Sequence, residues 1–215
     1  PGHPEYLDTE GVEMTTGPLG QGIASAVGFA MAEAHLAARF NTDEQKIIDH
    51  YTYVLSGDGC LMEGVSGEAS SLAGHLKLNK LILFYDRNEI TIEGSTDLAF
   101  TEDVAARYKS YGWQVLSVAD ANDTDAIAKA IEEAKANKEQ PTMIILHSNI
   151  GYGSPLAGSE ATHGSPLGDE NIVKTKEYLG WDVNLPALEI PQELKDYMAD
   201  VQARLSEDEK IWNET

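Results

Sequence analysis

Large apolar residues recur three or four positions apart through residues 20–40, and alanine fills most of the places between them. This spacing predicts a mostly buried helix, which the chain enters from a Gly-Pro loop. Residues 62–77 and 102–111 also indicate helices. Residues 123–138 are highly charged and begin with an Asp/Thr pair, which is typical of a surface helix with an N-terminal cap.

Short apolar runs alternate with these helices, at residues 51–57, 81–86, 113–118 and 142–148. The second and fourth runs are almost entirely apolar, which is typical of strands that are covered on both faces. Strands and helices that alternate with short links predict a parallel sheet. We therefore expect an α/β fold, a doubly wound and mostly parallel sheet with helices on both faces.

Two later segments break this alternation. Residues 149–170 are rich in Gly, Pro and Ser, and a loop of that length in a compact domain is usually functional. After about residue 185 the pattern changes to a helix that Pro191 starts. We expect an α/β domain over residues 1–185, incomplete at its N-terminus, and a helical linker over 186–215. The opening PGHPEY already resembles an active-site loop, so we expect a piece of a longer protein.

The charge of the chain limits its partners. Asp and Glu number 36 against 15 Lys and Arg, for a formal net charge of −21. Nucleic acid and anionic membranes are bound by Lys/Arg clusters, so neither is expected as a partner. No Lys or Arg precedes Arg39, and none lies between Lys138 and Lys174. A phosphate bound by these regions would need a metal ion and backbone N–H groups. The single cysteine, Cys60, fits a reducing cytoplasm.

Two neighbouring strand ends carry oxygen ligands. Gly57-Asp58-Gly59 ends one apolar run, and Asn88 closely follows the next. Ligands of open α/β sheets bind beyond the carboxyl ends of the strands. Mg²⁺ prefers oxygen donors and commonly takes one or two carboxylates together with phosphate oxygens. The glycines let the backbone approach a diphosphate closely. A plain turn is the alternative for GDG alone, but a GDG followed by Asn one βαβ step later matches the thiamine-diphosphate fingerprint.

A wider resemblance rests on long strings of residues. PGHPE, TTGPLGQGI, GDGCLMEG, EASSLAGHLKL, DRNEITIEG and IGYGSPLAG with a later HG resemble transketolases, from residue 1 to at least residue 185. The resemblance implies transfer of a two-carbon ketol unit from a ketose phosphate to an aldose phosphate, in the pentose phosphate pathway. It implies thiamine diphosphate and Mg²⁺ or Ca²⁺ as cofactors, and a homodimer. Relative to the family, both an N-terminal part and the pyrimidine-binding domain are absent from this chain.

The resemblance also assigns residues. The metal ligands would be Asp58, Asn88 and the backbone carbonyl of Ile90. Arg87 stands where many members carry Asp; it either adds positive charge near the diphosphate or, as we prefer, points to solvent. The positions implied to contact the cofactor are Gly17, Leu19, Gly57, Asp58, Gly59, Glu63, Asn88, Ile92, Ile150 and His163. For Ile92 and Ile150, which would pack on the thiazolium ring, ordinary core packing is the other interpretation.

Two histidines are the catalytic candidates that the resemblance implies. His3, in GHPE, would contact the hydroxyls of the substrate, and His163, in ATHGSPLG, would lie near the diphosphate and the substrate. An imidazole can exchange a proton near neutral pH, which suits such a role. The remaining histidines are expected to be structural or solvent-exposed. Cys60 is interpreted as a small buried residue and not as a nucleophile.

Glu63 and Glu68 lie five positions apart on the expected helix 62–77, so they would not share a face. The resemblance assigns this pair to the dimer contact that links two active sites, and solvated acids are the alternative. In the family the partner subunit's pyrimidine-binding domain completes the site. We therefore expect no turnover from this chain alone, and truncation through a doubly wound domain risks aggregation.

Three other interpretations stay open. A dihydroxyacetone synthase shares most of these motifs and differs in its acceptor. A 1-deoxyxylulose-5-phosphate synthase arranges its domains differently and is not expected to combine GHPE with GPLGQG at this spacing. From another class, the chain would be a non-catalytic half of a split enzyme or a binding module without activity, although the motifs are complete over this region.

Overall fold

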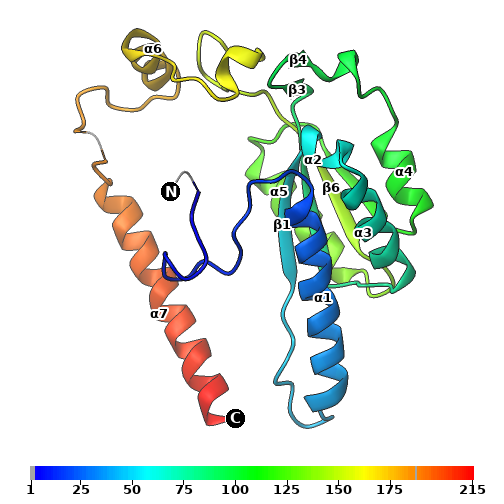
Figure 1. The fold of residues 1–215 in the computed structure, drawn as a ribbon. Helices are drawn as coiled ribbons and strands as arrows, with labels where there is room; N and C mark the ends of the chain where they lie inside the picture. The colour runs from blue at the N-terminus through cyan, green and yellow to red at the C-terminus, as the bar shows by residue number, and fades with distance from the viewer. Residues whose placement is uncertain (1–2, 187) are drawn as a thin grey trace.

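The computed structural model describes residues 3–186 and 188–215 and contains a four-stranded parallel sheet with helices on both faces (Figure 1). The strands of this sheet lie in the order β1-β2-β6-β5. Their bounds are β1 Thr52–Gly57, β2 Leu81–Arg87, β5 Gln114–Val118 and β6 Thr142–His147. The predicted α/β fold is confirmed, and each of the four predicted strands is present close to its expected bounds.

Helices and short turns connect these strands. The helices are α1 Gln21–Phe40, α2 Asp58–Met62, α3 Gly64–His75, α4 Val104–Ser110, α5 Thr124–Ala136, α6 Asp169–Tyr178 and α7 Gln192–Glu214. Two 3₁₀ turns, η1 Thr96–Leu98 and η2 Glu160–Thr162, and a small antiparallel hairpin of β3 Ile90–Thr91 and β4 Gly94–Ser95 complete the secondary structure. The expected cap of α5 is confirmed, since the Asp123 side chain accepts a hydrogen bond from the Ala126 N–H at 2.9 Å.

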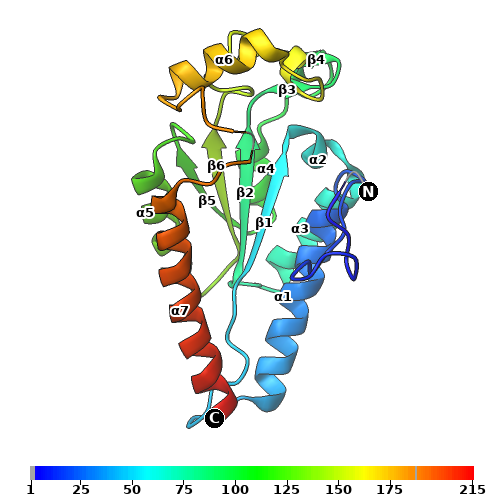
Figure 2. The same ribbon diagram turned by 90° about the vertical axis from the view of Figure 1, so that its left-hand side faces the viewer.

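The sheet separates two apolar cores. On one face, Leu83 and Tyr85 of β2 pack in a cluster with residues of α1, α3 and α4. On the other face, Ile82 and Phe84 of the same strand pack with residues of α5. Figure 2 shows α5 and α1 on opposite sides of the strands. Alternate side chains of a strand point to opposite faces, so a strand that is buried on both sides must be apolar throughout.

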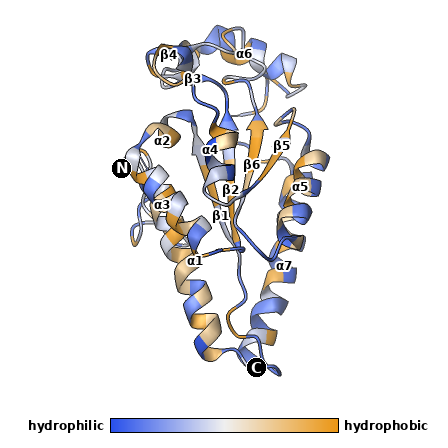
Figure 3. Ribbon diagram, turned by 90° about the vertical axis from the view of Figure 1, so that its right-hand side faces the viewer, coloured by the Kyte–Doolittle hydropathy of each residue, from blue (hydrophilic) through white to orange (hydrophobic). Residues whose placement is uncertain are grey.

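The first strand is an uncovered edge. β1 pairs with β2 on one side, and no other described strand pairs with it. Leu55 of β1 is 79% exposed and Tyr53 is 49% exposed, although both are large apolar residues of the sheet. Figure 3 shows the apolar colour concentrated in the central strands, between α1 and α5. This edge is where the doubly wound fold is incomplete within the described residues.

The helix predicted over residues 62–77 is confirmed as α3, and a short helix that was not predicted, α2, precedes it. α2 begins at Asp58, directly after β1, and ends at Met62, before α3 begins at Gly64. Glu63 separates them because its backbone is extended, at φ −76° and ψ 136°. The β3–β4 hairpin, α6 and η2 were not predicted, because two-residue strands and an amphipathic helix after a glycine-rich loop give weak periodic signals.

The last helix lies apart from the sheet. α7 begins after Pro191, as expected, and none of its residues is buried. Near its C-terminal end the Trp212 indole N–H donates to the Ile47 carbonyl at 3.1 Å. Figure 1 shows α7 to one side of the sheet and of the helices that cover it. Among the described residues, no helix combines the length and the apolar character that a membrane crossing needs.

Candidate functional site

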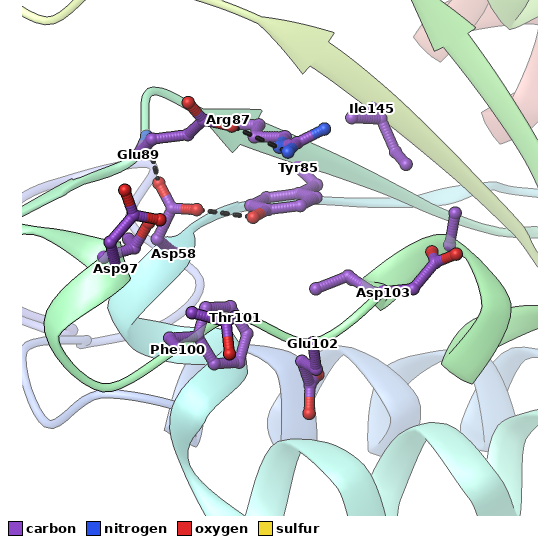
Figure 4. Close-up of a pocket in the computed structure, with 13 residues that line it drawn as sticks. Asp58, Tyr85, Arg87, Glu89, Asp97, Phe100, Thr101, Glu102, Asp103 and Ile145 are labelled. Carbon is purple, nitrogen blue, oxygen red and sulfur yellow. Dashed lines mark hydrogen bonds and ion pairs between the residues drawn. The ribbon is translucent and has the colours of Figure 1, made fainter.

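Asp58 is the central residue of the candidate site. It follows the last residue of β1 and is 3% exposed. Its Oδ1 accepts a hydrogen bond from the Tyr85 hydroxyl, and its Oδ2 accepts from the backbone N–H groups of Asn88 at 3.2 Å and Glu89 at 2.9 Å. Figure 4 shows the contacts of Asp58 with Tyr85 and Glu89 in the wall of a cavity. The carboxylate is therefore held by three donors, one on β2, Tyr85, and two directly after it, the N–H groups of Asn88 and Glu89.

The sheet register brings the two predicted strand ends together. Gly57 pairs with Asp86 in the parallel β1–β2 ladder, so the residues after both strands meet at one edge of the sheet. The Asn88 side chain turns onto its own loop, where Oδ1 accepts from the Ile90 N–H at 3.0 Å. Asp58, Asn88 and Ile90, the three predicted ligand positions, are thus joined by consecutive hydrogen bonds.

A left-handed residue makes this arrangement possible. Glu89 has φ 61°, a conformation that non-glycine residues rarely adopt. It reverses the chain directly after Asn88, which aims two successive N–H groups at one carboxylate oxygen. The Glu89 carbonyl then accepts from the Thr96 N–H at 2.9 Å, which closes the hairpin. Strain of this kind is common at functional sites, where the surrounding contacts hold it.

Tyr85 is a site residue that the sequence analysis missed. It is 2% exposed, and burial, together with the hydrogen bond to Asp58, raises its pKa far above the ordinary value. The hydroxyl therefore stays protonated and donates to the carboxylate. A signal was present in the sequence, because a tyrosine inside a fully buried strand needs a partner for its hydroxyl. In the structure that partner is Asp58, directly beyond the end of β1.

The glycine-rich loop before α1 packs against the turn after β1. Leu19 Cδ1 lies 3.3 Å from the position that a Cβ of Gly59 would occupy. Gly20 has φ 81°, and a Cβ there would meet Ser66 Oγ at 2.8 Å, so α1 starts close against α3. The His3 ring lies on Gly17, with its Cε1 3.3 Å from the place where a Cβ of Gly17 would stand. Leu19 and Gly59 are therefore neighbours, and so are His3 and Gly17. In each pair the two residues come from different predicted motifs.

The remaining predicted residues lie on the long loop and the hairpin. Figure 1 and Figure 2 show both segments beyond the carboxyl ends of the strands. His163 is exposed and follows η2, where its N–H donates to the Glu160 carbonyl at 2.9 Å. Ile150 is half-buried, but Ile92 is 71% exposed, so ordinary core packing was the wrong interpretation for Ile92. Within the described residues, no hydrogen bond joins His163 to Asp58 or Asn88.

The residues that flank the candidate ligands differ in their environments. Glu63 and Glu68 do not share a helix, because Glu63 is the extended residue between α2 and α3. Cys60 is half-buried and packs against the apolar core. Arg87 does not simply point to solvent, since it forms an ion pair with Glu89 at 2.6 Å while its side chain stays 42% exposed. Pro1 and Gly2, in the PGHPE motif, lie outside the described residues.

A cavity of about 460 Å³ borders Asp58 and Tyr85. Its lining is acidic, with Glu89, Asp97 and Glu102 beside Asp58, and Arg87 as a basic lining residue (Figure 4). An anion would not enter such a cavity without a cation beside it. The cavity therefore serves better as polar space behind the carboxylate than as a diphosphate pocket.

The donor set fits a small hard cation. Among the described residues, no three His, Cys, Asp or Glu side chains converge as a metal site would need. One carboxylate, one side-chain amide and backbone carbonyls are nevertheless a suitable set for Mg²⁺, which often completes its shell with phosphate oxygens and water. Each carboxylate oxygen has about two acceptor positions. Asp58 Oδ2 uses both for N–H groups, whereas Oδ1 uses one for Tyr85, so Oδ1 keeps a position for an ion.

Comparison with known proteins gives a consistent match. A family model described as transketolase, thiamine diphosphate binding domain, matches residues 1–215. A transketolase of Nostoc sp. is 56% identical over 217 residues, which cover 100% of this chain and 32% of the relative. A chloroplastic transketolase of Solanum tuberosum is 55% identical over 199 residues, covering 92% of this chain and 27% of the relative.

Solved structures agree with these relatives. A Pichia stipitis transketolase in complex with sedoheptulose 7-phosphate superposes with a TM-score of 0.97 at 50% identity, covering 100% of this chain and 32% of that one. A transketolase from Leishmania mexicana gives a TM-score of 0.96 at 50% identity with the same coverage. The chain spans about a third of the length of the relatives that it matches.

Proposed function

The chain belongs to the transketolase family, as its thiamine-diphosphate-binding domain, and from this premise we propose that it carries half of a ketol-transfer active site. The whole protein would transfer a two-carbon unit from a ketose phosphate to an aldose phosphate, in the pentose phosphate pathway of the cytoplasm. Residues 1–185 would form the diphosphate and metal domain. Residues 186–215 would form a helical linker towards a pyrimidine-binding domain.

The metal ion would bind where the ends of β1 and β2 meet. Asp58, Asn88 and the carbonyl of Ile90 would hold Mg²⁺ or Ca²⁺, which would neutralise the diphosphate. This role suits a chain in which no Lys or Arg precedes Arg39. The Asp58 carboxylate is buried in a chain of net charge −21, and a buried charge is costly unless it is paired. A bound metal ion would supply that positive charge.

Backbone groups of two loops would bind the diphosphate. Gly17 and Leu19 precede α1, a helix of 20 residues whose free N–H groups favour an anion, and Gly57 and Gly59 flank Asp58. Thiamine diphosphate, when bound, supplies the reactive thiazolium carbon that carries the two-carbon unit. Ile92 and Ile150 would contact the ring of the cofactor. The 71% exposure of Ile92 supports this, because an exposed isoleucine on a loop gains by covering an apolar ligand.

Two histidines would contact the sugar phosphate substrate. His3 and His163 are both exposed, so a substrate can reach either imidazole. His3 would contact the hydroxyls of the substrate, and His163 would lie near the diphosphate and the substrate, where an imidazole can relay protons. A second copy of the protein would complete the site through its pyrimidine-binding domain, and Glu63, on the exposed junction of α2 and α3, would lie at that contact.

The observation that carries this proposal is the hydrogen-bonded set of Asp58 and Asn88 at adjacent strand ends. Its test is calorimetric titration of thiamine diphosphate into the protein expressed from its complete reading frame, with Mg²⁺ and then with EDTA. We expect binding that needs Mg²⁺, and we expect Asp58→Asn to weaken it at least tenfold. Asp97→Asn is the control, because Asp97 lines the same cavity but is exposed.

Two outcomes would refute the proposal. One is wild-type protein that binds no thiamine diphosphate with or without Mg²⁺. The other is an equal loss in both variants, which would show that general charge and not the strand-end site governs binding. Assays of ketol transfer to an aldose phosphate and to formaldehyde would separate a transketolase from a dihydroxyacetone synthase.

A further inference from the structure

Tyr85 is the only side chain that hydrogen-bonds Asp58 within the described residues. We propose that Tyr85 is a positioning residue, which orients the Asp58 carboxylate for the metal ion through its hydroxyl on Oδ1. This inference rests on the proposed function, because it assumes that Asp58 is a metal ligand. It adds a residue that no motif indicates.

The three donors fix the carboxylate in one orientation. The N–H groups of Asn88 and Glu89 occupy Oδ2, and the Tyr85 hydroxyl occupies one acceptor position of Oδ1. A rotation of the carboxylate would misalign these hydrogen bonds, which weaken steeply as their geometry departs from linear. The two N–H groups alone hold one oxygen and leave the plane of the carboxylate less defined. Tyr85 therefore determines where the free acceptor position of Oδ1 points.

The cavity behind the site explains why the hydroxyl is needed. Tyr85 and Asp58 both line a cavity of about 460 Å³, which leaves space on one side of the carboxylate. Without the hydroxyl, Asp58 could swing towards this space and bind water there. Hydrogen-bonded outer-shell partners of metal ligands typically contribute roughly 10- to 100-fold to metal affinity through such orientation.

Tyr108 offers a matched comparison. It is also buried, at 0% exposure, in the same apolar core, and its hydroxyl pairs with Ser70 Oγ at 3.0 Å. That contact joins α4 to α3 and does not involve a proposed ligand. Tyr85→Phe and Tyr108→Phe therefore remove the same group from the same core, and only the first should change the metal site.

The two candidate cations should respond differently. Mg²⁺ demands nearly ideal octahedral geometry at short distances, whereas Ca²⁺ accepts variable geometry and coordination number. A carboxylate that has lost its orientation should therefore lose affinity for Mg²⁺ more than for Ca²⁺. A loss of core stability alone would lower the affinity for both cations by the same factor.

The experiment uses the protein expressed from its complete reading frame, with thiamine diphosphate in excess. Mg²⁺ and Ca²⁺ are titrated separately by calorimetry into wild type, Tyr85→Phe and Tyr108→Phe, after melting temperatures have shown that each is folded. We expect Tyr85→Phe to raise the Kd for Mg²⁺ by about tenfold or more, with a smaller rise for Ca²⁺, and Tyr108→Phe to stay near wild type. Tyr85→4-aminophenylalanine keeps a weaker donor and should fall between wild type and Tyr85→Phe.

Each other result would overturn a defined claim. An unchanged Mg²⁺ affinity in Tyr85→Phe, an equal loss for both cations, or an equal loss in Tyr108→Phe would overturn the positioning role while leaving the proposed function intact. Wild-type protein without metal-dependent binding would overturn the proposed function itself. If Tyr85→Phe does not fold, the 4-aminophenylalanine variant decides, and an equal rise in the Kd for Mg²⁺ and for Ca²⁺ in it would overturn the role.

Discussion

The Leu19 side chain packs directly against Gly59: Leu19 Cδ1 is 3.3 Å from the position that a Cβ of Gly59 would occupy. Leu19 lies in the loop before α1, and Gly59 lies in the first turn of α2, directly after β1. Their contact sets the distance between the two backbone segments that are proposed to bind the diphosphate. The glycine is therefore part of the shape of the site.

Gly59→Ala should weaken thiamine diphosphate binding while leaving the fold intact. The added methyl group would push Leu19 and its loop away by a few tenths of an ångström, because Leu19 is 52% exposed and can move. Overpacking of this kind costs about 1 kcal/mol or more, which corresponds to a roughly five- to tenfold higher Kd. Calorimetry with Mg²⁺ would measure it. Gly64→Ala is the control, since nothing lies within 4 Å of its Cβ position, and equal binding in both variants would contradict the prediction.

Gly20→Ala should lower the free energy of unfolding more than the same substitution at any exposed glycine of α1. Gly20 has φ 81°, and its Cβ would lie 2.8 Å from Ser66 Oγ and 2.9 Å from Val65 Cγ1. A strained backbone together with overpacking costs about 2 to 4 kcal/mol. Gly28→Ala, in the middle of α1 with nothing within 4 Å of the new Cβ, should instead stabilise by roughly 0.5 to 1 kcal/mol. Urea unfolding measures both, and effects of the same sign would refute the account.

Lys80 should stabilise the fold through Glu33. The Lys80 ammonium lies 2.6 Å from the carboxylate of Glu33, whose side chain is 5% exposed in α1. Lys80→Met would leave a buried carboxylate without its partner, at a cost of about 3 kcal/mol. A cycle of Lys80→Met, Glu33→Gln and the double variant, measured by urea unfolding, should give a coupling free energy above about 1 kcal/mol. Simple additivity would show that the pair does not interact.

The same pair predicts a pH dependence with a definite sign. Burial lowers the pKa of Lys80, but the hydrogen bonds to Asp49 and Glu33 outweigh it and raise the pKa above its ordinary 10.5. A raised lysine pKa contributes stability that is complete below the ordinary pKa and is lost as the pH rises through the raised one. The difference in unfolding free energy between wild type and Lys80→Met should therefore be constant from about pH 7 to 9 and shrink above about pH 10.5. A difference that already shrinks below about pH 9 would contradict this.

Residues 1–215 expressed alone should self-associate through β1. Leu55 is 79% exposed on a strand whose outer edge has no partner among the described residues, and such edges pair with other copies. Leu55→Lys should shift the protein towards monomer in light scattering after size-exclusion chromatography. Leu98→Lys is the matched control, because Leu98 is 74% exposed but lies in η1, away from the sheet edge. Equal effects of the two changes would indicate non-specific association.

Much of the fold was predictable because its signals are local. α1 follows from residues of helical spacing over 20 positions, and β2 and β6 follow from apolar runs that only doubly covered strands tolerate. Asp58 and Asn88 were predicted as neighbours, because the carboxyl ends of parallel strands meet at one edge. The end of α2 at Met62 was not predictable, since the extended backbone of Glu63 is set by the packing of α3 against Gly20.

The sequence by itself determined the alternation of the four main strands with their helices, the family and the residues proposed to bind the cofactor, because periodicity and motif are properties of neighbouring positions. Tertiary structure alone decided that Tyr85 donates to Asp58, that Leu19 rests on Gly59 and that Ile92 is exposed. Those relationships depend on sheet register and on close packing between segments distant in sequence. Side-chain orientation at such distances is a result of packing the whole core, which no local pattern encodes.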